Sequence, residues 1–243
     1  MHPTVKPLFA ALALAAVCGA FAQEAVIRKV LPERLPQLPK IDEVTPTKIN
    51  GLYEVRYGGT EILYSDEKGE TVFINGSMVD TKTRQDMTEA RIEKLLAVDF
   101  DKLPLKDAVL IKQGSGVRKM AVFVDPNCGY CKRFERDIAA IKDVTIYTFL
   151  MPILGADSTV KARDIWCSKE PSTAWRSWML DGVTPTRAMK CDSAAIERNL
   201  EFAQKQRING TPAVFFADGT RKPGAISGEM VEKLLVAAAA AKK

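Results

Sequence analysis

Cys128 and Cys131, separated by Gly129 and Tyr130, are the residues of this sequence best suited to chemistry. A cysteine thiolate attacks the sulfur of a disulfide, and a second cysteine one helical turn away can then resolve the mixed disulfide that forms. We therefore expect Cys128 to be the nucleophile and Cys131 the resolving cysteine of thiol–disulfide exchange. A lysine and an arginine follow directly and add positive charge, which favours a thiolate over a thiol.

The residues on either side of this pair predict the elements that position it. Residues 120–124 form a continuous apolar run, as expected of a strand that is covered on both faces. After the pair, Phe134, Ile138 and Ile141 recur at helical spacing. A helix that begins at Cys128 places its sulfur among unpaired backbone N–H groups at the positive end of the helix dipole, which stabilises a thiolate.

The pair could also form a purely structural disulfide or supply half of a zinc site. The apolar strand before it and the amphipathic helix after it are the context of a redox motif and argue against the structural bridge. Zinc needs two more ligands, but Cys167 and Cys191 do not form a second Cys-x-x-Cys motif, and the only histidine is His2. No metal site is expected, and catalysis that needs a histidine is excluded from the mature chain.

Residues 1–22 have the features of a signal peptide. Lys6 supplies a positive charge, residues 8–17 are a short apolar run, and residues 20–22, Ala-Phe-Ala, match the pattern that signal peptidase cuts after. The residues before Cys18 match a lipid-attachment signal poorly. No further run of membrane length follows. We expect an exported, soluble chain that is not stably inserted in a membrane.

The cysteine count, the length and the charge limit the number of disulfides, the number of domains and the kind of partner that we expect. Four cysteines follow the signal peptide, and this even number in an exported chain favours two disulfides, for which three connectivities exist. Spacing separates one close pair from one distant pair. The length of 243 residues is comfortable for two domains. The formal net charge of +5 is spread without a basic block, so no nucleic-acid partner is expected.

The N-terminal half predicts a small sheet. Residues 24–31 favour a short helix that Pro32 should stop. Short β-branched or aromatic runs separated by glycine-containing turns then predict an antiparallel meander with strands at residues 44–50, 52–57, 61–64 and 71–74. A sheet this small usually needs a helix or a partner chain to cover it. A helix over residues 85–98, with an apolar stripe, is expected to connect it to the next domain.

The C-terminal half predicts an α/β domain. Further strands are expected at residues 144–150, 213–217 and 220–222, a largely helical region at residues 157–208 broken near Pro171 and Pro185, and a final helix around Met230 to Leu235. The fold class is therefore α+β. We expect an N-terminal domain at residues 23–84, a linker helix at residues 85–103 and a catalytic domain at residues 104–243.

Three short motifs carry a resemblance to a known family. They are the Gly-Tyr dipeptide between Cys128 and Cys131, residues 210–213 (Gly-Thr-Pro-Ala), and the pair Trp166-Cys167 and Cys191-Asp192. Together they resemble the Dsb family of bacterial periplasmic oxidoreductases, and its DsbC type in particular. The resemblance covers nearly all of the chain that follows the signal peptide and implies a thioredoxin fold with a helical insertion.

The resemblance also implies roles for specific residues. Thr211 and Pro212 match the Thr-cis-Pro loop that faces the active-site cysteines and binds the backbone of an extended substrate. Cys167 and Cys191 match the second cysteine pair, which forms a structural disulfide. Gly76 follows an apolar strand in the N-terminal domain, where DsbC-like chains pair with their copy, and is expected in the dimer interface.

The function implied is that of a periplasmic, homodimeric protein disulfide isomerase. Its substrates would be misoxidised exported proteins, and a DsbD-like membrane electron donor would keep it reduced; no cofactor is implied. Two alternatives remain. One is a DsbG-like reductase of single oxidised cysteines, although DsbG-like sequences have proline where this chain has Gly129. The other is a holdase chaperone that binds unfolded chains without chemistry, as its sole role or beside the exchange reaction.

Overall fold

The computed structural model describes residues 9–188 and 191–241, so Lys6 and Leu8 of the predicted signal peptide lie outside the described chain. The remainder of that peptide lies in the first helix, α1 (Phe9–Arg34). Across the described residues, no helix combines the length and the apolar character that a membrane crossing requires. Cleavage of the signal peptide stays a prediction.

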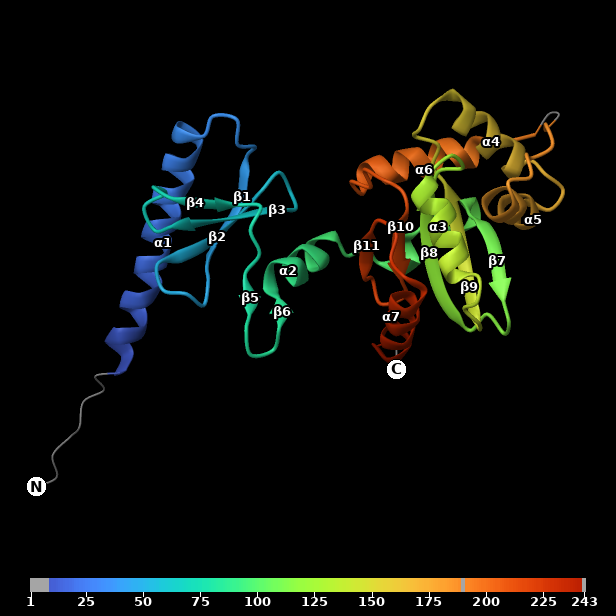
Figure 1. The fold of residues 1–243 in the computed structure, drawn as a ribbon. Coiled ribbons are helices and arrows are strands. Elements are labelled where there is room, and N and C mark those ends of the chain that lie inside the picture. Colours follow the sequence, from blue (N-terminus) through green and yellow to red (C-terminus); the bar gives the residue numbers. More distant parts are fainter. Residues whose placement is uncertain (1–8, 189–190, 242–243) are drawn as a thin grey trace, which may run out of the picture. The chain divides into compact units, whose positions relative to one another are not determined.

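The chain divides into two compact units, with the boundary between Leu95 and Leu96. Both units combine helices with sheets, which is the α+β class that the sequence predicted (Figure 1). The first unit holds a four-stranded antiparallel sheet, and the second holds a five-stranded mixed sheet.

The sheet of the first unit is the predicted meander, with its strands in the same order in space as in the chain. The strands are β1 (Ile41–Pro46), β2 (Leu52–Tyr57), β3 (Glu61–Asp66) and β4 (Val72–Ile74). The predicted turns hold Gly51, Gly58 and Gly69 at positive φ, which glycine adopts without a steric cost. The first strand ends earlier than expected because Thr47 Oγ1 accepts the N–H of Ile49 at 3.0 Å and starts the turn.

Helix α1 continues to Arg34, past the point where we expected Pro32 to stop it. A proline removes one N–H donor from a helix. Here it lies in the last turn, and the N–H of Leu35 still reaches the carbonyl of Leu31 at 2.8 Å. Ile27 and Leu31 are buried against the sheet. Because burial of this face outweighs one missing hydrogen bond, the predicted break at Pro32 was wrong.

A small hairpin that the sequence did not predict follows the meander. Its strands are β5 (Val79–Asp80) and β6 (Gln85–Asp86). The carboxylate of Asp80 accepts the backbone N–H groups of Lys82 and Thr83, both at 2.9 Å, and so forms the turn. The predicted connecting helix comes next as α2 (Met87–Leu96). It starts later than expected because the residues before it belong to the hairpin.

The sheet of the second unit has the strand order β11-β10-β8-β9-β7. Strands β8 and β9 are parallel, and the other neighbours are antiparallel. The strands are β7 (Val109–Gln113), β8 (Arg118–Val124), β9 (Val144–Leu150), β10 (Ala213–Phe216) and β11 (Arg221–Pro223). Strand β7 was not predicted, whereas the other four lie where the sequence placed them.

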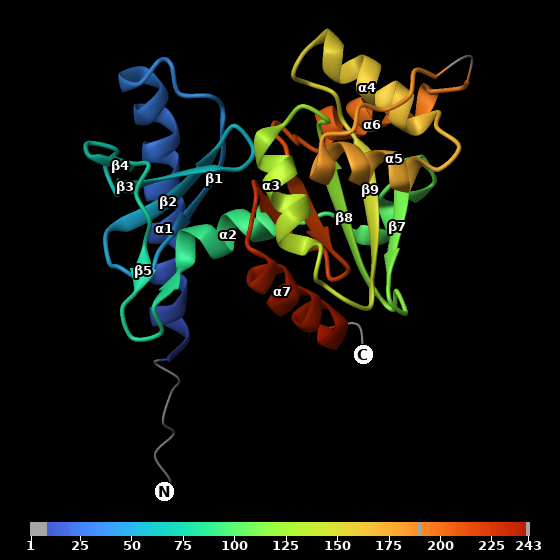
Figure 2. The ribbon, with the colours of Figure 1, turned by 45° about the vertical axis from the view of Figure 1, so that its right-hand side comes forward.

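Helices cover both faces of this sheet (Figure 2). Met120 and Val122 of β8 pack in one core with side chains of α3 and α7, while Phe123 packs in a second core with side chains of α6. All three residues are fully buried, which explains the uninterrupted apolar run in the sequence. The helices are α3 (Gly129–Ile138), α6 (Ala194–Lys205) and α7 (Gly228–Ala241).

The predicted helical region lies between β9 and β10, and we call residues 151–212 the insertion. Its elements before α6 are α4 (Ala156–Trp166), α5 (Pro171–Arg176) and a π-helical turn (Ser177–Asp181). Pro171 begins α5 rather than only breaking the chain, because the first position of a helix does not need an N–H donor. The π-helical turn is a rare element that often lies near a functional site.

Candidate active site

Cys128 is the N-cap residue of α3, and its side chain is only 5% exposed. Its Sγ accepts the backbone N–H of Cys131 at 3.3 Å. Such a bond is stronger when the sulfur is a thiolate, so the helix start favours the nucleophilic form. In the thiol form, Sγ–H donates to the backbone carbonyl of Thr211 at 3.3 Å. Both cysteines of this motif are free thiols in the structure.

Cys131 is fully buried in the core beneath α3. Burial raises the pKa of the Cys131 thiol far above its usual range, because the charged form loses its hydration. Hydrogen bonds with the backbone of Asp125 and the side chain of Thr211 act in the opposite direction, while the neighbouring Cys128 raises the pKa further. The two sulfurs therefore differ: burial keeps Cys131 protonated, whereas the Cys128 sulfur receives a backbone N–H at the start of α3.

Thr211 and Pro212 lie opposite the cysteine pair. The peptide bond between them is cis. Thr211 reaches both sulfurs, through its carbonyl to Cys128 and through its side chain to Cys131. The fold thus brings together residues that are 83 positions apart in the chain.

A buried carboxylate, Asp125, organises the loop that leads into α3. It is fully inaccessible and accepts four hydrogen bonds, from donors before and after β9. The donors are the N–H of Asn127 at 2.7 Å, the N–H of Ile153 at 2.7 Å, the N–H of Leu154 at 2.9 Å and the hydroxyl of Ser158 at 2.7 Å. Four hydrogen bonds immobilise the carboxylate, so the loop before Cys128 is held in one conformation.

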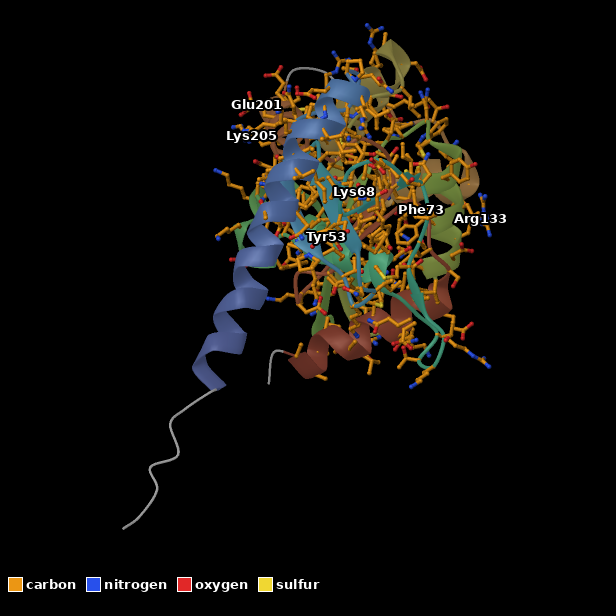
Figure 3. The ribbon with its side chains drawn as sticks, turned by 90° about the vertical axis from the view of Figure 1, so that its left-hand side faces the viewer. Tyr53, Lys68, Phe73, Arg133, Glu201 and Lys205 are labelled. Atoms are coloured by element: carbon orange, nitrogen blue, oxygen red, sulfur yellow. A yellow bond between two sulfur atoms is a disulfide. The ribbon has the colours of Figure 1, made fainter. Side chains whose placement is uncertain are left out.

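The charged residues that follow the motif behave differently from one another. The Nζ of Lys132 lies 4.0 Å from the ring centroid of Trp178. Arg133 instead extends into solvent from α3 (Figure 3), with 72% of its side chain exposed and Asp137 at 3.8 Å. Of the two cations that the sequence placed near the site, only Lys132 is held by a neighbouring side chain of the insertion.

A buried acid lies one turn further along α3. Glu135 is 3% exposed and accepts the indole N–H of Trp175 at 2.7 Å. Burial raises the pKa of the Glu135 carboxyl, although the Trp175 bond and the charge of Arg176 partly counter this. The underside of the catalytic helix therefore carries a carboxyl group that is easier to protonate than usual.

Cys167 and Cys191 form a disulfide with a Cα–Cα distance of 5.9 Å. Cys167 directly follows α4, and Cys191 precedes α6. Nearby, the indole N–H of Trp166 donates to the carbonyl of Asp192 at 3.0 Å. The disulfide and the hydrogen bond thus join the two ends of the segment between α4 and α6.

Gly76 lies in the first unit, just after β4, and therefore belongs to a different part of the molecule from the cysteines. A Cβ atom added to it would meet no atom of the chain within 4 Å. The adjacent β4 is the last strand of its sheet and carries Phe73, which is labelled in Figure 3. Phe73 and Ile74 are 59% and 50% exposed. The structure thus leaves an apolar sheet edge next to an open glycine.

A groove adjoins the cysteine pair on the surface. It is lined by Tyr130, Arg133, Asp137, Thr211, Ile226 and Ser227, among others. Tyr130 is 69% exposed at the centre of the motif. No cluster of three or more histidine, cysteine, aspartate or glutamate residues suited to a metal ion occurs among the described residues.

Known proteins match both units of the chain. A family model described as a thioredoxin-like domain matches residues 105–239, and one described as a disulfide bond isomerase protein N-terminal domain matches residues 18–89. The probable thiol:disulfide interchange protein DsbC of Bordetella avium is 44% identical over 200 residues, which cover 82% of this chain and 70% of that protein. The chain belongs to the DsbC family.

Other members of the family extend the comparison. The probable DsbC of Bordetella parapertussis is 47% identical over 185 residues, which cover 76% of this chain but only 65%, less than two thirds, of that relative. The DsbC of Escherichia coli is 26% identical over 227 residues, with 90% of this chain and 91% of the relative covered. A crystal structure of a disulfide interchange protein from Neisseria gonorrhoeae has a TM-score of 0.53 at 33% identity, and covers 56% of this chain and 98% of its own.

The structure adds residues to the DsbC-type site that sequence reasoning missed. The sequence context could have indicated Asp125, because this residue directly follows a buried strand and precedes a proline and the cysteine motif. The indication for Glu135 was weaker: it is an acid on the apolar face of the predicted helix. Nothing in the sequence indicated Trp178 or Ser158, since their contact with the site depends on how the insertion folds back.

Proposed function

We propose that this chain is a periplasmic protein disulfide isomerase, which reduces and reshuffles incorrect disulfides in exported proteins. The observation that carries the proposal is the placement of the Cys128 sulfur at the start of α3, with the N–H of Cys131 directed at it. Membership of the DsbC family supports the same activity. The predicted signal peptide supports export to the periplasm.

In the first step, the Cys128 thiolate attacks one sulfur of a substrate disulfide. A bond forms between Cys128 and that sulfur, the substrate S–S bond breaks, and the second substrate sulfur leaves as a thiolate. The released thiolate can attack another disulfide of the same substrate. When a substrate thiolate finally displaces Cys128, the substrate has been isomerised without net oxidation or reduction.

Cys131 provides a second outcome. Its sulfur attacks Cys128 in the mixed disulfide, so that a Cys128–Cys131 bond forms and the bond to the substrate breaks. The departing substrate thiolate takes up the proton that Cys131 loses, and the substrate gains two electrons. Because burial keeps Cys131 protonated, this escape is slowed, which favours reshuffling before release. A dithiol reductant of the DsbD type must then return the pair to the reduced state.

Thr211 and Pro212 are proposed to bind the substrate backbone. The Thr211 carbonyl faces Cys128 and the groove beside the motif includes Thr211 and the exposed ring of Tyr130. An extended substrate segment laid against this loop would pair with its backbone, as in β-augmentation. Recognition of backbone rather than of side chains suits an enzyme that must accept many misoxidised proteins.

The active form is proposed to be a homodimer joined through the first unit. The support is the open edge of β4, which exposes Phe73 and Ile74 and has few charges to guard it. A second copy that pairs with this edge would bury both side chains. The open space around Gly76 is where such a copy would approach.

Refolding of a scrambled multi-disulfide protein tests the proposed activity. The wild-type chain should accelerate recovery of the native substrate in a glutathione buffer, and Cys128→Ser should reduce that rate to background, because no other described free thiol lies at a helix start. Suppression of aggregation that persists in Cys128→Ser without any refolding would indicate a holdase instead. Recovery by Cys128→Ser at the wild-type rate would overturn the proposal.

Gly76→Arg tests the dimer. A Cβ atom at this position meets no atom of the same chain within 4 Å, so a change in oligomeric state would report on a partner. We expect a folded monomer that keeps dithiol redox activity and loses isomerase activity and resistance to a DsbA-type oxidant. Gel filtration with light scattering measures the state, and Glu67→Arg, which places the same side chain in an exposed turn at the other end of β4, is the matched control. A monomeric wild type would refute the proposed homodimer, and a Gly76→Arg variant that stays dimeric would place the interface elsewhere.

A further inference from the structure

Trp178 of the π-helical turn touches both sides of the cysteine motif. Its indole N–H donates to the carbonyl of Pro126 at 2.6 Å, two residues before Cys128. The face of the same ring lies 4.0 Å from the Nζ of Lys132, the residue directly after Cys131. One partly buried side chain of the insertion therefore spans the start of α3.

A second cation joins this arrangement. The Nζ of Lys161 lies 4.8 Å from the Trp178 ring and also bonds the carboxylate of Asp157. The same carboxylate oxygen of Asp157 accepts the side-chain amide of Asn127 at 2.7 Å, next to Cys128. The insertion thus holds the active-site loop at Pro126 through Trp178 and at Asn127 through Asp157.

The consequence for the sulfur is electrostatic. The backbone N–H of Lys132 bonds the carbonyl of Cys128 at 3.0 Å, so the backbone of this lysine lies one helical turn after the nucleophile. A free lysine side chain would spread over many conformations in water, whereas an aromatic face fixes the ammonium group in one place. A fixed cation and a fixed N-terminal loop both stabilise a thiolate. A stabilised thiolate favours the dithiol over the disulfide and makes the pair more oxidising.

We infer that Trp178 is a positioning residue which, through Lys132 and Pro126, stabilises the reduced state of Cys128 and Cys131. The inference rests on the proposed thiol–disulfide function. It means that a residue of the insertion helps to set the equilibrium between the dithiol and disulfide forms of the cysteine pair. The tuned equilibrium is the reaction of the dithiol with one oxidised glutathione to give the Cys128–Cys131 disulfide and two reduced glutathiones. Two thiol protons and two electrons pass to glutathione, so no other reactant is needed.

The test measures this equilibrium in glutathione buffers for the full chain. Trp178→Leu removes both contacts and should shift the equilibrium roughly 3- to 10-fold toward the disulfide, the range expected for one partly buried cation–π contact. The thiolate absorbance of the reduced form should fall in parallel at neutral pH. Trp178→Phe keeps an aromatic face for Lys132 and loses only the bond to Pro126. Its glutathione equilibrium should therefore lie between those of the wild type and Trp178→Leu.

Substitutions of the lysine separate its charge from the packing of the tryptophan. Lys132→Gln should reproduce most of the Trp178→Leu shift, while Lys132→Arg should restore the wild-type equilibrium because a guanidinium group also stacks on an aromatic ring. Lys169→Gln, at an exposed lysine of the same insertion, is the matched control and should leave the equilibrium unchanged.

A second control tests for general loosening of the insertion. Trp166→Leu removes a tryptophan of the same insertion whose indole N–H also bonds a backbone carbonyl, that of Asp192. Trp178→Leu should destabilise the reduced form more than the oxidised form in thermal unfolding, whereas Trp166→Leu should affect both forms alike. An unchanged glutathione equilibrium in Trp178→Leu, or an equal shift in Trp166→Leu, would overturn the inference. A wild-type chain that does not equilibrate with glutathione would instead refute the proposed function itself.

Discussion

Cys128 and Cys131 lie within one turn of α3, whereas Cys167 and Cys191 come from separate segments of the insertion and are joined by a disulfide. The free pair is buried, and one of its sulfurs receives a backbone N–H from the helix start. The bonded pair is more exposed, and its neighbouring polar contact, Trp166 to Asp192, fastens chain segments together. The comparison shows that the chemistry of a cysteine depends on which backbone groups surround it.

The largest expected effect lies in trapping experiments that contrast the two pairs. Cys131→Ser should accumulate mixed disulfides between Cys128 and substrates, because the resolving sulfur is gone while the attacking one remains. Non-reducing gels followed by peptide mapping would detect these adducts. Cys128→Ser should form none. Adducts mapped to Cys167 or Cys191 in an otherwise wild-type chain would contradict the division of roles.

Removal of the bonded pair should affect stability rather than chemistry. Replacing Cys167 and Cys191 together with alanine should lower the free energy of unfolding by about 2–4 kcal/mol, because the unfolded chain is no longer constrained. Denaturant titration measures this loss. The rate at which Cys128 reacts with a small disulfide should remain within about twofold of wild type, since the contacts of its sulfur come from α3 and Thr211. A collapse of that rate would show that the insertion disulfide is needed to build the site.

A pH-dependent effect is expected from the buried acid beneath the catalytic helix. Since burial raises the pKa of Glu135 in the folded state, folding favours its protonated form. Its contribution to stability is complete below the unfolded value near 4.3 and is lost as the pH rises through the folded pKa. Glu135→Gln keeps an acceptor for Trp175 and removes the ionisation.

The Glu135→Gln variant should therefore be more stable than wild type at neutral pH. Its advantage should shrink as the pH falls and vanish below about pH 4, where wild-type Glu135 is protonated in both states. Thermal unfolding across the pH range measures this difference. A constant difference at every pH would show that ionisation of Glu135 is not its source.

The smallest expected effect concerns the hydroxyl of Thr211. Thr211→Val removes the side-chain hydrogen bond to Cys131 and keeps the carbonyl that faces Cys128. A single hydrogen bond of this kind contributes about 0.5–1.5 kcal/mol. The equilibrium between dithiol and disulfide should therefore shift by a few-fold, as measured with glutathione, while the double alanine variant of the insertion pair should leave it unchanged.

The sequence predicted the parts of this molecule that depend on local pattern. The apolar run before Cys128 and the helical spacing after it predicted β8 and α3 correctly. Alternating runs and glycine turns predicted the meander of the first unit. The predicted break at Pro32 was wrong because burial of Ile27 and Leu31 stabilises this helix beyond what its local sequence indicates.

Local sequence patterns could not predict contacts between distant segments of the chain. The short β5–β6 hairpin depends on one Asp80 turn, and β7 is a five-residue strand that is recognisable only beside β9. The same limit applies to the site. Thr211 was expected near the cysteines only through family resemblance, and Trp178 could not be expected there at all, since nothing in its neighbourhood of the sequence indicates that it folds back onto Pro126.

The Cys167–Cys191 disulfide has a further consequence for a chain that a protease has cut. The segment that it encloses includes residues 182–184, which are exposed and directly follow the π-helical turn. A protease that cuts there produces two fragments, one with the cysteine motif and one with Thr211. The disulfide keeps these fragments covalently attached, and β8 and β10 remain paired across the cut. A nicked molecule therefore keeps both halves of its site together.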